Sequence, residues 1–309
     1  MLEVSVIICS HNPRSNYLRR VLEALEHQTL EKERWEILLV DNCSDPPLEK
    51  QWNLTWHPRG RHVREGRLGV TYAHFQGIGQ AEGELLVFVD DDNVLEIDYL
   101  EKAIEIAQQF PQIGVFGGTV SGEYEVPVPS WIEPYLEALA VREIARDRWA
   151  NDYSWSDAVP YGAGMCVRKT VARHYAASAE KEPLRREISR VGANKLTSCE
   201  DVDTAWTAID LGLGTGVFRK LKAVHLIRAE RISEEYVVRL LWGTTYSYLV
   251  LRAARGLSVE WPTTGWRDVI RMWAASVRLR GPHRRIFFAK RQATKSAWRM
   301  LYSCKETSH

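Results

Sequence analysis

Residues 81–93 read Ala-Glu-Gly-Glu-Leu-Leu-Val-Phe-Val-Asp-Asp-Asp-Asn. The apolar run at 85–89 has the length of a buried strand, and three aspartates follow it directly. Adjacent carboxylates at a strand end repel one another unless a cation neutralises them. Mg²⁺ and Mn²⁺ prefer such oxygen ligands and commonly bridge them to phosphate oxygens. The stretch therefore predicts a strand that ends at a divalent-metal site, with a solvated acidic turn as the alternative.

Strand and helix patterns alternate on both sides of this stretch. Apolar runs predict the strands, and the segments between them have helical spacing. The expected strands cover residues 4–9, 36–40, 84–89 and 113–117, and the expected helices cover 71–81 and 99–109. This order is typical of an α/β fold with a mostly parallel, Rossmann-like sheet and helices on both faces. Ligands of such sheets bind beyond the carboxyl ends of the strands, where Asp41 and the aspartate row fall.

The second half of the chain has a looser pattern. We expect a helix over residues 131–148, a mobile basic loop over 178–198, and helices over 199–210 and 234–255. Glu200 and Asp201 open the helix at 199–210, where acidic residues either cap the helix or take part in chemistry. Two roles are also open for Asp41: it could form an Asx turn or accept a hydrogen bond from a nucleobase.

Six motifs in this order resemble family 2 of the glycosyltransferases, the inverting enzymes with the GT-A fold. The resemblance covers about residues 3–255. The motifs are Val-Ile-Ile-Cys-Ser-His-Asn-Pro (6–13), Val-Asp-Asn-Cys-Ser-Asp (40–45), Gly-Val-Thr-Tyr-Ala-His-Phe-Gln-Gly (69–77), the acidic stretch 81–93, Tyr-Gly-Ala-Gly-Met-Cys-Val-Arg (161–168) and Glu-Asp-Val-Asp (200–203). The chain has His74 and Phe75 where the family usually has Arg-Asn, so Arg67 or His74 would supply the sugar or phosphate contact expected there.

Carried over position by position, the resemblance implies a nucleotide-sugar site. The residues that would line the nucleotide pocket are Ser10, His11, Asn12, Asp41, Arg67, Asp90 and Asp91. Within that set, Asp41 would face the base, and the two aspartates 90 and 91 would contact the ribose and the pyrophosphate. Asp92 would be the direct ligand of Mn²⁺ or Mg²⁺. Asp201 would be the general base, and Glu200 would position the acceptor or the base.

His225 follows the expected base by 24 positions, at a predicted strand end. Some GT-A enzymes use a C-terminal histidine as a metal ligand, and imidazole suits Mn²⁺; a hydrogen-bonded structural histidine is the alternative. In the implied reaction the metal offsets the charge on the departing diphosphate, and one carboxylate takes the proton of the acceptor hydroxyl. The resemblance implies a UDP-sugar as donor and a saccharide or lipid-linked acceptor, as in bacterial polysaccharide or glycan biosynthesis.

Two other enzyme classes of related topology are excluded by the loop after the first strand. A dinucleotide-binding dehydrogenase needs Gly-x-Gly-x-x-Gly there, and a sugar-nucleotide pyrophosphorylase needs a glycine-rich basic loop, whereas this chain has Ser-His-Asn-Pro. A catalytically silent nucleotide-sugar or glycan-binding protein of the GT-A fold is the remaining alternative. Such a protein is expected to lose the aspartate row or Glu200 and Asp201, and all of them are present.

Charge is distributed unevenly along the 309 residues. The formal net charge is +1, but the chain from Trp261 onward holds 11 Lys and Arg against 2 Asp and Glu. This basic tail would either bind an anionic membrane surface or pack on the catalytic domain as a helix with a solvated face. Five scattered cysteines and the lack of an apolar leader are typical of a cytoplasmic protein. We therefore expect a cytoplasmic location, peripheral on the inner face of the cell membrane if the tail binds lipid.

These patterns predict two domains. A GT-A catalytic domain would cover residues 1–230, with a nucleotide-binding half at about 1–120 and an acceptor-binding half at about 121–230. A helical, basic extension would cover residues 231–309. The expected partners are the nucleotide sugar and the acceptor, and no nucleic acid is expected.

Overall fold

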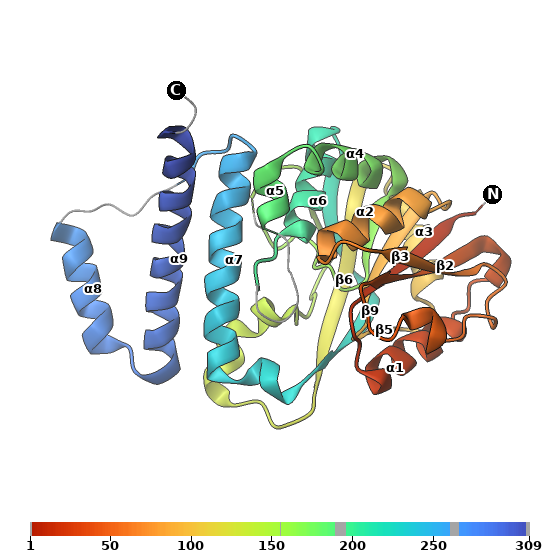
Figure 1. Cartoon of the computed structure of the whole chain (residues 1–309), viewed down its shortest axis with the longest axis horizontal. Helices are drawn as coiled ribbons and strands as arrows, with labels where there is room; N and C mark the ends of the chain where they lie inside the picture. The colour runs from red at the N-terminus through yellow and green to blue at the C-terminus, as the bar shows by residue number, and fades with distance from the viewer. Residues whose placement is uncertain (1, 155, 189–195, 260–265, 307–309) are drawn as a thin grey trace. The chain divides into compact units, whose positions relative to one another are not determined.

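A computed structural model describes residues 2–154, 156–188, 196–259 and 266–306 (Figure 1). The chain forms two compact units. The first contains residues 1–125, 140–181 and 200–227, and the second contains 126–139, 182–199 and 228–309. The segments 126–139 and 182–199 thus group with the C-terminal helices. The division into domains at residue 230 stays a prediction.

Nine strands in the described part of the chain form one sheet within the first unit. They are β1 (Val4–Ser10), β2 (Trp35–Asn42), β3 (Gly60–Glu65), β4 (Leu85–Asp90), β5 (Asn93–Leu95), β6 (Ile113–Tyr124), β7 (Arg148–Ala150), β8 (Met165–Arg168) and β9 (Gly214–Ile227). Their order is β3-β2-β1-β4-β8-β6-β9-β5, with β7 also paired to β9. Strands β3, β2, β1 and β4 are parallel, as are β6 and β9, whereas β5, β7 and β8 pair antiparallel. The predicted mostly parallel α/β sheet is confirmed.

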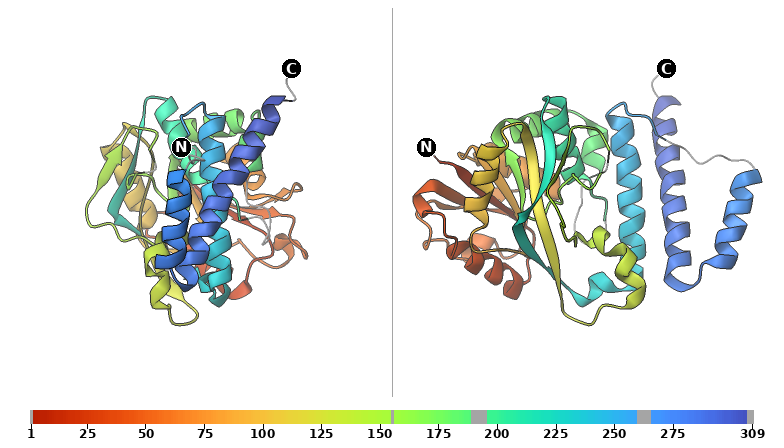
Figure 2. Two further views of the ribbon diagram at one scale, coloured as in Figure 1. Left: turned by 90° about the vertical axis from the view of Figure 1, so that its left-hand side faces the viewer. Right: turned by 180° about the vertical axis from the view of Figure 1, so that it is seen from behind.

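Helices cover both faces of this sheet (Figures 1 and 2). In the first unit they are α1 (Ser15–Glu26), α2 (Val70–Gln80), α3 (Tyr99–Gln109), α4 (Lys169–Ala179) and α6 (Glu200–Asp210). Alternate residues of a strand face opposite sides, so a sheet covered on both sides needs continuously apolar strands. Val6 and Ile8 of β1 belong to the core cluster that contains residues of α1 and α3. Ile7 points the other way, toward Gly77 of α2, where a Cβ atom would lie 2.5 Å from the Ile7 side chain.

Two predictions in the second half of the chain are wrong. Residues 131–148 do not form an α-helix: a 3₁₀ helix covers Ser130–Leu139, and β7 begins at Arg148. Pro134 lies inside the segment and cannot supply the N–H group that an α-helix needs, which explains the difference. The expected loop at 178–198 contains the end of α4 and a short helix, α5 (Pro183–Glu187), and Glu182 caps α5 by accepting from the Leu184 amide. Residues 189–195 of that loop lie outside the described residues.

The second unit contains three longer helices, α7 (Glu234–Ala254), α8 (Trp266–Arg278) and α9 (Gly281–Glu306). Ser233 caps α7 by accepting a hydrogen bond from the Tyr236 amide. Helix α9 packs against α7, and its buried stripe consists of Ile286, Ala289, Ala293 and Ala297. Small side chains on this stripe allow the two helices to approach closely. In the part of the chain that is described, no helix combines the length and the apolar character needed to cross a membrane.

His57 makes the stability of the first unit depend on pH. Its side chain is 3% exposed, its ring centroid lies 4.1 Å from that of Trp35, and its Nδ1 accepts a hydrogen bond from the Arg59 amide at 3.2 Å. Burial and the nearby charge of Lys32 lower the pKa of His57 to about 4, from its ordinary value of 6.5. Between these values the unfolded chain binds the proton and the folded chain does not, so protonation favours unfolding.

We therefore expect the free energy of unfolding to fall by about 3 kcal/mol as the pH is lowered from about 6.5 to about 4. Urea denaturation at a series of pH values measures this change. His57→Phe should flatten the dependence, and substitution of the exposed His27 to Phe should leave it unchanged. An equal slope in the wild type and in His57→Phe would contradict the assignment.

Candidate active site

The carboxyl ends of four neighbouring strands stand in register at one edge of the sheet. Ser10 of β1 pairs with Asp41 of β2, and Asp41 pairs with Arg64 of β3. On the other side of β1, Cys9 pairs with Asp90 of β4. The sheet thus brings Ser10, Asp41 and the aspartate row to one edge, as the sequence predicts for a ligand site.

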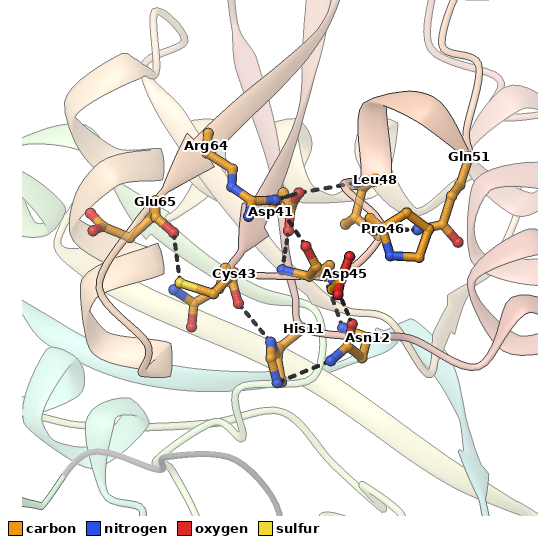
Figure 3. A network of polar contacts seen from close by, with 12 residues as sticks. His11, Asn12, Asp41, Cys43, Asp45, Pro46, Leu48, Gln51, Arg64 and Glu65 are labelled. Atoms are coloured by element: carbon orange, nitrogen blue, oxygen red, sulfur yellow. Dashed lines mark hydrogen bonds and ion pairs between the residues drawn. The ribbon is translucent and has the colours of Figure 1, made fainter.

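Both carboxylate oxygens of Asp41 accept hydrogen bonds. Its Oδ1 accepts from the Ser44 amide at 2.8 Å, and its Oδ2 accepts from the Leu48 amide at 3.0 Å and from Arg64 (Figure 3). Burial by itself raises the pKa of Asp41, but the Leu48 and Ser44 amides and Arg64 outweigh it, so that the pKa is lowered. Asp41 is therefore ionised and organises the loop after β2, which is the Asx-turn role. Its contact with a base stays a prediction.

The loops that follow β1 and β2 are tied together by short polar contacts (Figure 3). His11 Nδ1 donates to the Asn42 carbonyl oxygen at 2.7 Å. The Asn12 amide donates to Ser44 Oγ at 3.0 Å, and Asn12 Oδ1 accepts from the Asp45 amide at 2.9 Å. Asn12 adopts a left-handed backbone conformation, with φ of 47°, which asparagine tolerates well. The predicted nucleotide-pocket residues His11 and Asn12 are thus part of one preorganised double loop.

The three aspartates at the end of β4 differ in burial. Asp90 is exposed and Asp91 is half-buried, with Ser10 Oγ donating to Asp91 Oδ2. Asp92 is 6% exposed, and its Oδ1 accepts from Asn93 Nδ2 at 3.1 Å. Asp92 is thus the buried member of the aspartate row.

Asp92 lies beside His225. The short strand β5 pairs with β9, with Asn93 opposite His225, and His225 Nε2 lies 3.5 Å from Asp92 Oδ2. Two ligand atoms held about 2.1 Å from one ion at a right angle lie about 3 Å apart, so the pair fits a shared divalent cation. No group of three or more His, Cys, Asp or Glu side chains among the described residues is arranged to hold a metal ion. The role of Asp92 and His225 as metal ligands stays a prediction.

Glu200 and Asp201 begin α6, as expected. Glu200 is 7% exposed, and Thr71 Oγ1 of α2 donates to its Oε1 at 3.4 Å. Asp201 is half-buried, and its Oδ1 accepts from the Val202 amide at 2.8 Å. Burial lowers the pKa of His74, and the negative charge of Glu200 opposes that shift. His74, which stands where the family usually has arginine, is thus an electrostatic neighbour of Glu200.

Arg67 is engaged within its own loop. Its guanidinium binds both oxygens of Glu65, at 3.0 and 3.1 Å, and lies 4.5 Å from the ring centre of Tyr72. Asn42 anchors the same loop by accepting from the Gly69 amide at 2.8 Å and donating to the Arg67 carbonyl at 2.7 Å. A contact of Arg67 with the donor phosphates stays a prediction.

Sequence patterns did not identify Arg64, Asn42 or Thr71 as parts of the site. Arg64 belongs to β3, whose sequence Gly-Arg-His-Val-Arg-Glu lacks the apolar run that predicts a strand. Arg64 follows Asp41 by 23 positions, and nothing local in the sequence connects the two residues. An open surface depression lined by residues 146–150 and 156–158 lies along β7, which pairs with the amino-terminal part of β9, and none of the expected site residues lines it.

Comparisons with known proteins show the family and the fold of the chain. Residues 5–172 match the family model described as glycosyl transferase family 2. The glycosyltransferase AglE of Haloferax volcanii is 28% identical over 124 residues, which are 39% of this chain and 40% of that protein. The glucosyl-dolichyl phosphate glucuronosyltransferase of the same organism is 23% identical over 138 residues, which are 42% of this chain and 40% of that protein. The matches thus cover about two fifths of these relatives.

Solved structures show the same fold at low sequence identity. The mannosyltransferase PcManGT from Pyrobaculum calidifontis, solved with GDP-Man and Mn²⁺, matches with a TM-score of 0.58 at 14% identity and covers 96% of this chain and 85% of that one. S. aureus TarS matches with a TM-score of 0.52 at 14% identity, covering 96% and 55%. The chain belongs to glycosyl transferase family 2 and has the GT-A fold.

Proposed function

We propose that the chain is a metal-dependent, inverting glycosyltransferase that transfers a hexosyl group from a UDP-sugar to a hydroxyl of a saccharide or lipid-linked saccharide. The observation that carries this proposal is the buried pair of Asp92 and His225, 3.5 Å apart, beside Asp91 and Ser10 at the carboxyl edge of the sheet. An aspartate and an imidazole are acceptable ligands of Mn²⁺, and phosphate oxygens of the donor would complete the coordination.

In the proposed mechanism the acceptor oxygen attacks the anomeric carbon as the bond to the diphosphate breaks. A bound divalent ion would offset the negative charge on the departing diphosphate. Asp201 takes the proton of the acceptor hydroxyl, and Glu200, held by Thr71, positions the acceptor or the base. The diphosphate leaves with the bonding electrons and needs no proton, so a second catalytic acid is unnecessary. One displacement of this kind inverts the anomeric configuration.

We also propose that the chain is a peripheral protein at the inner face of the cell membrane. It would act there in polysaccharide or glycan biosynthesis. The support is the basic excess from Trp261 onward, with 11 Lys and Arg against 2 Asp and Glu. Basic residues near an anionic surface attract it, and a lipid-linked acceptor is presented there.

A nucleotide-sugar screen tests the proposed donor and metal. Binding to the folded state raises the melting temperature by mass action. We expect a UDP-sugar to raise the melting temperature in the presence of Mn²⁺ and to be hydrolysed slowly without an acceptor. If GDP- or dTDP-sugars raise the melting temperature and UDP-sugars do not, the donor is not a UDP-sugar. Binding without any turnover would favour a catalytically silent binding protein.

A substitution can distinguish a metal-binding role of His225 from a structural one. We expect His225→Asn to weaken Mn²⁺-dependent UDP binding by about tenfold or more, because even outer-shell partners of a metal are worth that much. Calorimetry of UDP with and without Mn²⁺ measures the effect. His174→Asn, at an exposed position of α4, is the control. A lower melting temperature with unchanged Mn²⁺ dependence would show that His225 is structural.

A further inference from the structure

Helix α8 presents four large apolar side chains to solvent. Trp266, Ile270, Trp273 and Val277 are 69%, 54%, 68% and 59% exposed. At 100° per residue, these four positions fall within about 60° of one another around the helix axis. The side chains therefore form one continuous stripe along α8, which we call the α8 stripe. Isolated exposed apolar residues are ordinary, but a contiguous row that includes two tryptophans indicates a binding surface.

More than half of the surface of each residue in the α8 stripe is exposed. Helix α9 packs against α7 through its own buried face, and it follows α8 after a short turn (Figures 1 and 2). Two aromatic residues of α9, Trp298 and Tyr302, are 43% and 44% exposed, with ring centres 4.8 Å apart. Exposed aromatic surface is thus concentrated in the hairpin of α8 and α9.

The positive charge of the α8–α9 hairpin favours an anionic partner. Residues 266–302 contain ten Lys and Arg and a single acidic residue. Arg278, Arg280 and Arg284 lie at and beside the turn between α8 and α9, and all three are exposed. A second copy of this chain would bring the same positive charge against itself, which is unfavourable. An anionic lipid surface offers both an apolar interior for the stripe and phosphates for the arginines.

We propose that α8 is an interfacial helix that lies in the plane of an anionic membrane with the α8 stripe inserted among the acyl chains. Tryptophan prefers this depth because its ring is apolar and its N–H stays near the headgroups. The arginines of the turn bind lipid phosphates, and α8 is too short and too polar to span the bilayer. The inference rests on the membrane part of the proposed function and is independent of the donor and the metal.

The test is co-sedimentation of the full chain with vesicles of phosphatidylglycerol and phosphatidylcholine, and with phosphatidylcholine alone. We expect binding to the anionic vesicles that weakens with salt. Ile270→Asp combined with Val277→Asp should weaken it by at least tenfold, because charge is excluded from the acyl region. The matched control is Ile97→Asp combined with Val126→Asp, at apolar positions that are 59% and 41% exposed outside the α8–α9 hairpin.

Each outcome decides the proposal. Equal vesicle binding by the stripe variant and the wild type would overturn it, as would a wild type that ignores anionic vesicles at low salt. If the wild type is a dimer that the stripe variant dissociates, the stripe is an interface between copies and the membrane assignment is wrong. Mn²⁺-dependent hydrolysis of a UDP-sugar in vesicle-free buffer is measured on the same samples. That activity should persist in the stripe variant, and its absence in all variants would count against the proposed function and not against the stripe.

Discussion

Asp92→Asn is expected to abolish Mn²⁺-dependent donor binding while the protein stays folded. Asparagine has nearly the same volume, and its oxygen can still accept the hydrogen bond that Asn93 Nδ2 makes to Asp92 Oδ1 at 3.1 Å. What the variant loses is the negative charge that lies 3.5 Å from His225 Nε2. A neutral amide is a poor ligand for a hard divalent cation, so the site would lose its charged donor.

We expect the affinity for UDP in the presence of Mn²⁺ to fall about 10²-fold or more, and the Mn²⁺-independent affinity to stay the same. Calorimetry with and without the ion measures both. The control is Asp157→Asn, which removes a solvent-exposed partner of Arg148. If the row is only an acidic turn, the substitution should relieve repulsion and raise the melting temperature without changing the binding of UDP. Unchanged Mn²⁺-dependent affinity would therefore remove Asp92 from the metal site.

The strands predicted from the sequence are those that lie inside the sheet. β1, β2 and β4 are buried on both faces, so each contains a run of four or five apolar residues that needs no tertiary information to identify. β3, β5 and β7 were not predicted, because β3 is polar and half-buried and the other two have three residues each. Short or polar strands are specified by their partners in the sheet, which a local pattern does not contain.

The contrast between local sequence patterns and strand pairing also explains which parts of the site could be predicted. The aspartate row directly follows a buried strand, so its place at the sheet edge could be predicted from residues 85–93 alone. The pairing of Asp92 with His225 depends on β5 lying beside β9 across more than 130 positions of sequence. The Arg64 ion pair with Asp41 depends in the same way on β3. Motifs thus identified the residues that follow strands, and the sheet register determined their neighbours.

Asp201→Asn is expected to lower the rate of sugar transfer by about 10² to 10⁴ while donor binding survives, because this is the usual contribution of a positioned general base. Asp201 is half-buried, whereas Glu200 and Asp203 on either side are 7% and 2% exposed. Its position thus leaves the Asp201 carboxylate more accessible to an acceptor than those of its neighbours. Its Oδ1 accepts from the Val202 amide at 2.8 Å, and the oxygen of asparagine can accept the same hydrogen bond.

The substitution therefore distinguishes a catalytic role of Asp201 from a helix-capping role. A capping role predicts that Asp201→Asn keeps both its melting temperature and its turnover, since asparagine caps a helix as well as aspartate does. A catalytic role predicts an unchanged melting temperature, unchanged Mn²⁺-dependent UDP affinity and a large loss of transfer. Asp210→Asn, at the other end of α6, is the matched control and should transfer sugar normally. Near-normal turnover in Asp201→Asn would refute the assignment, and the proton would then have to go to Glu200 or Asp203.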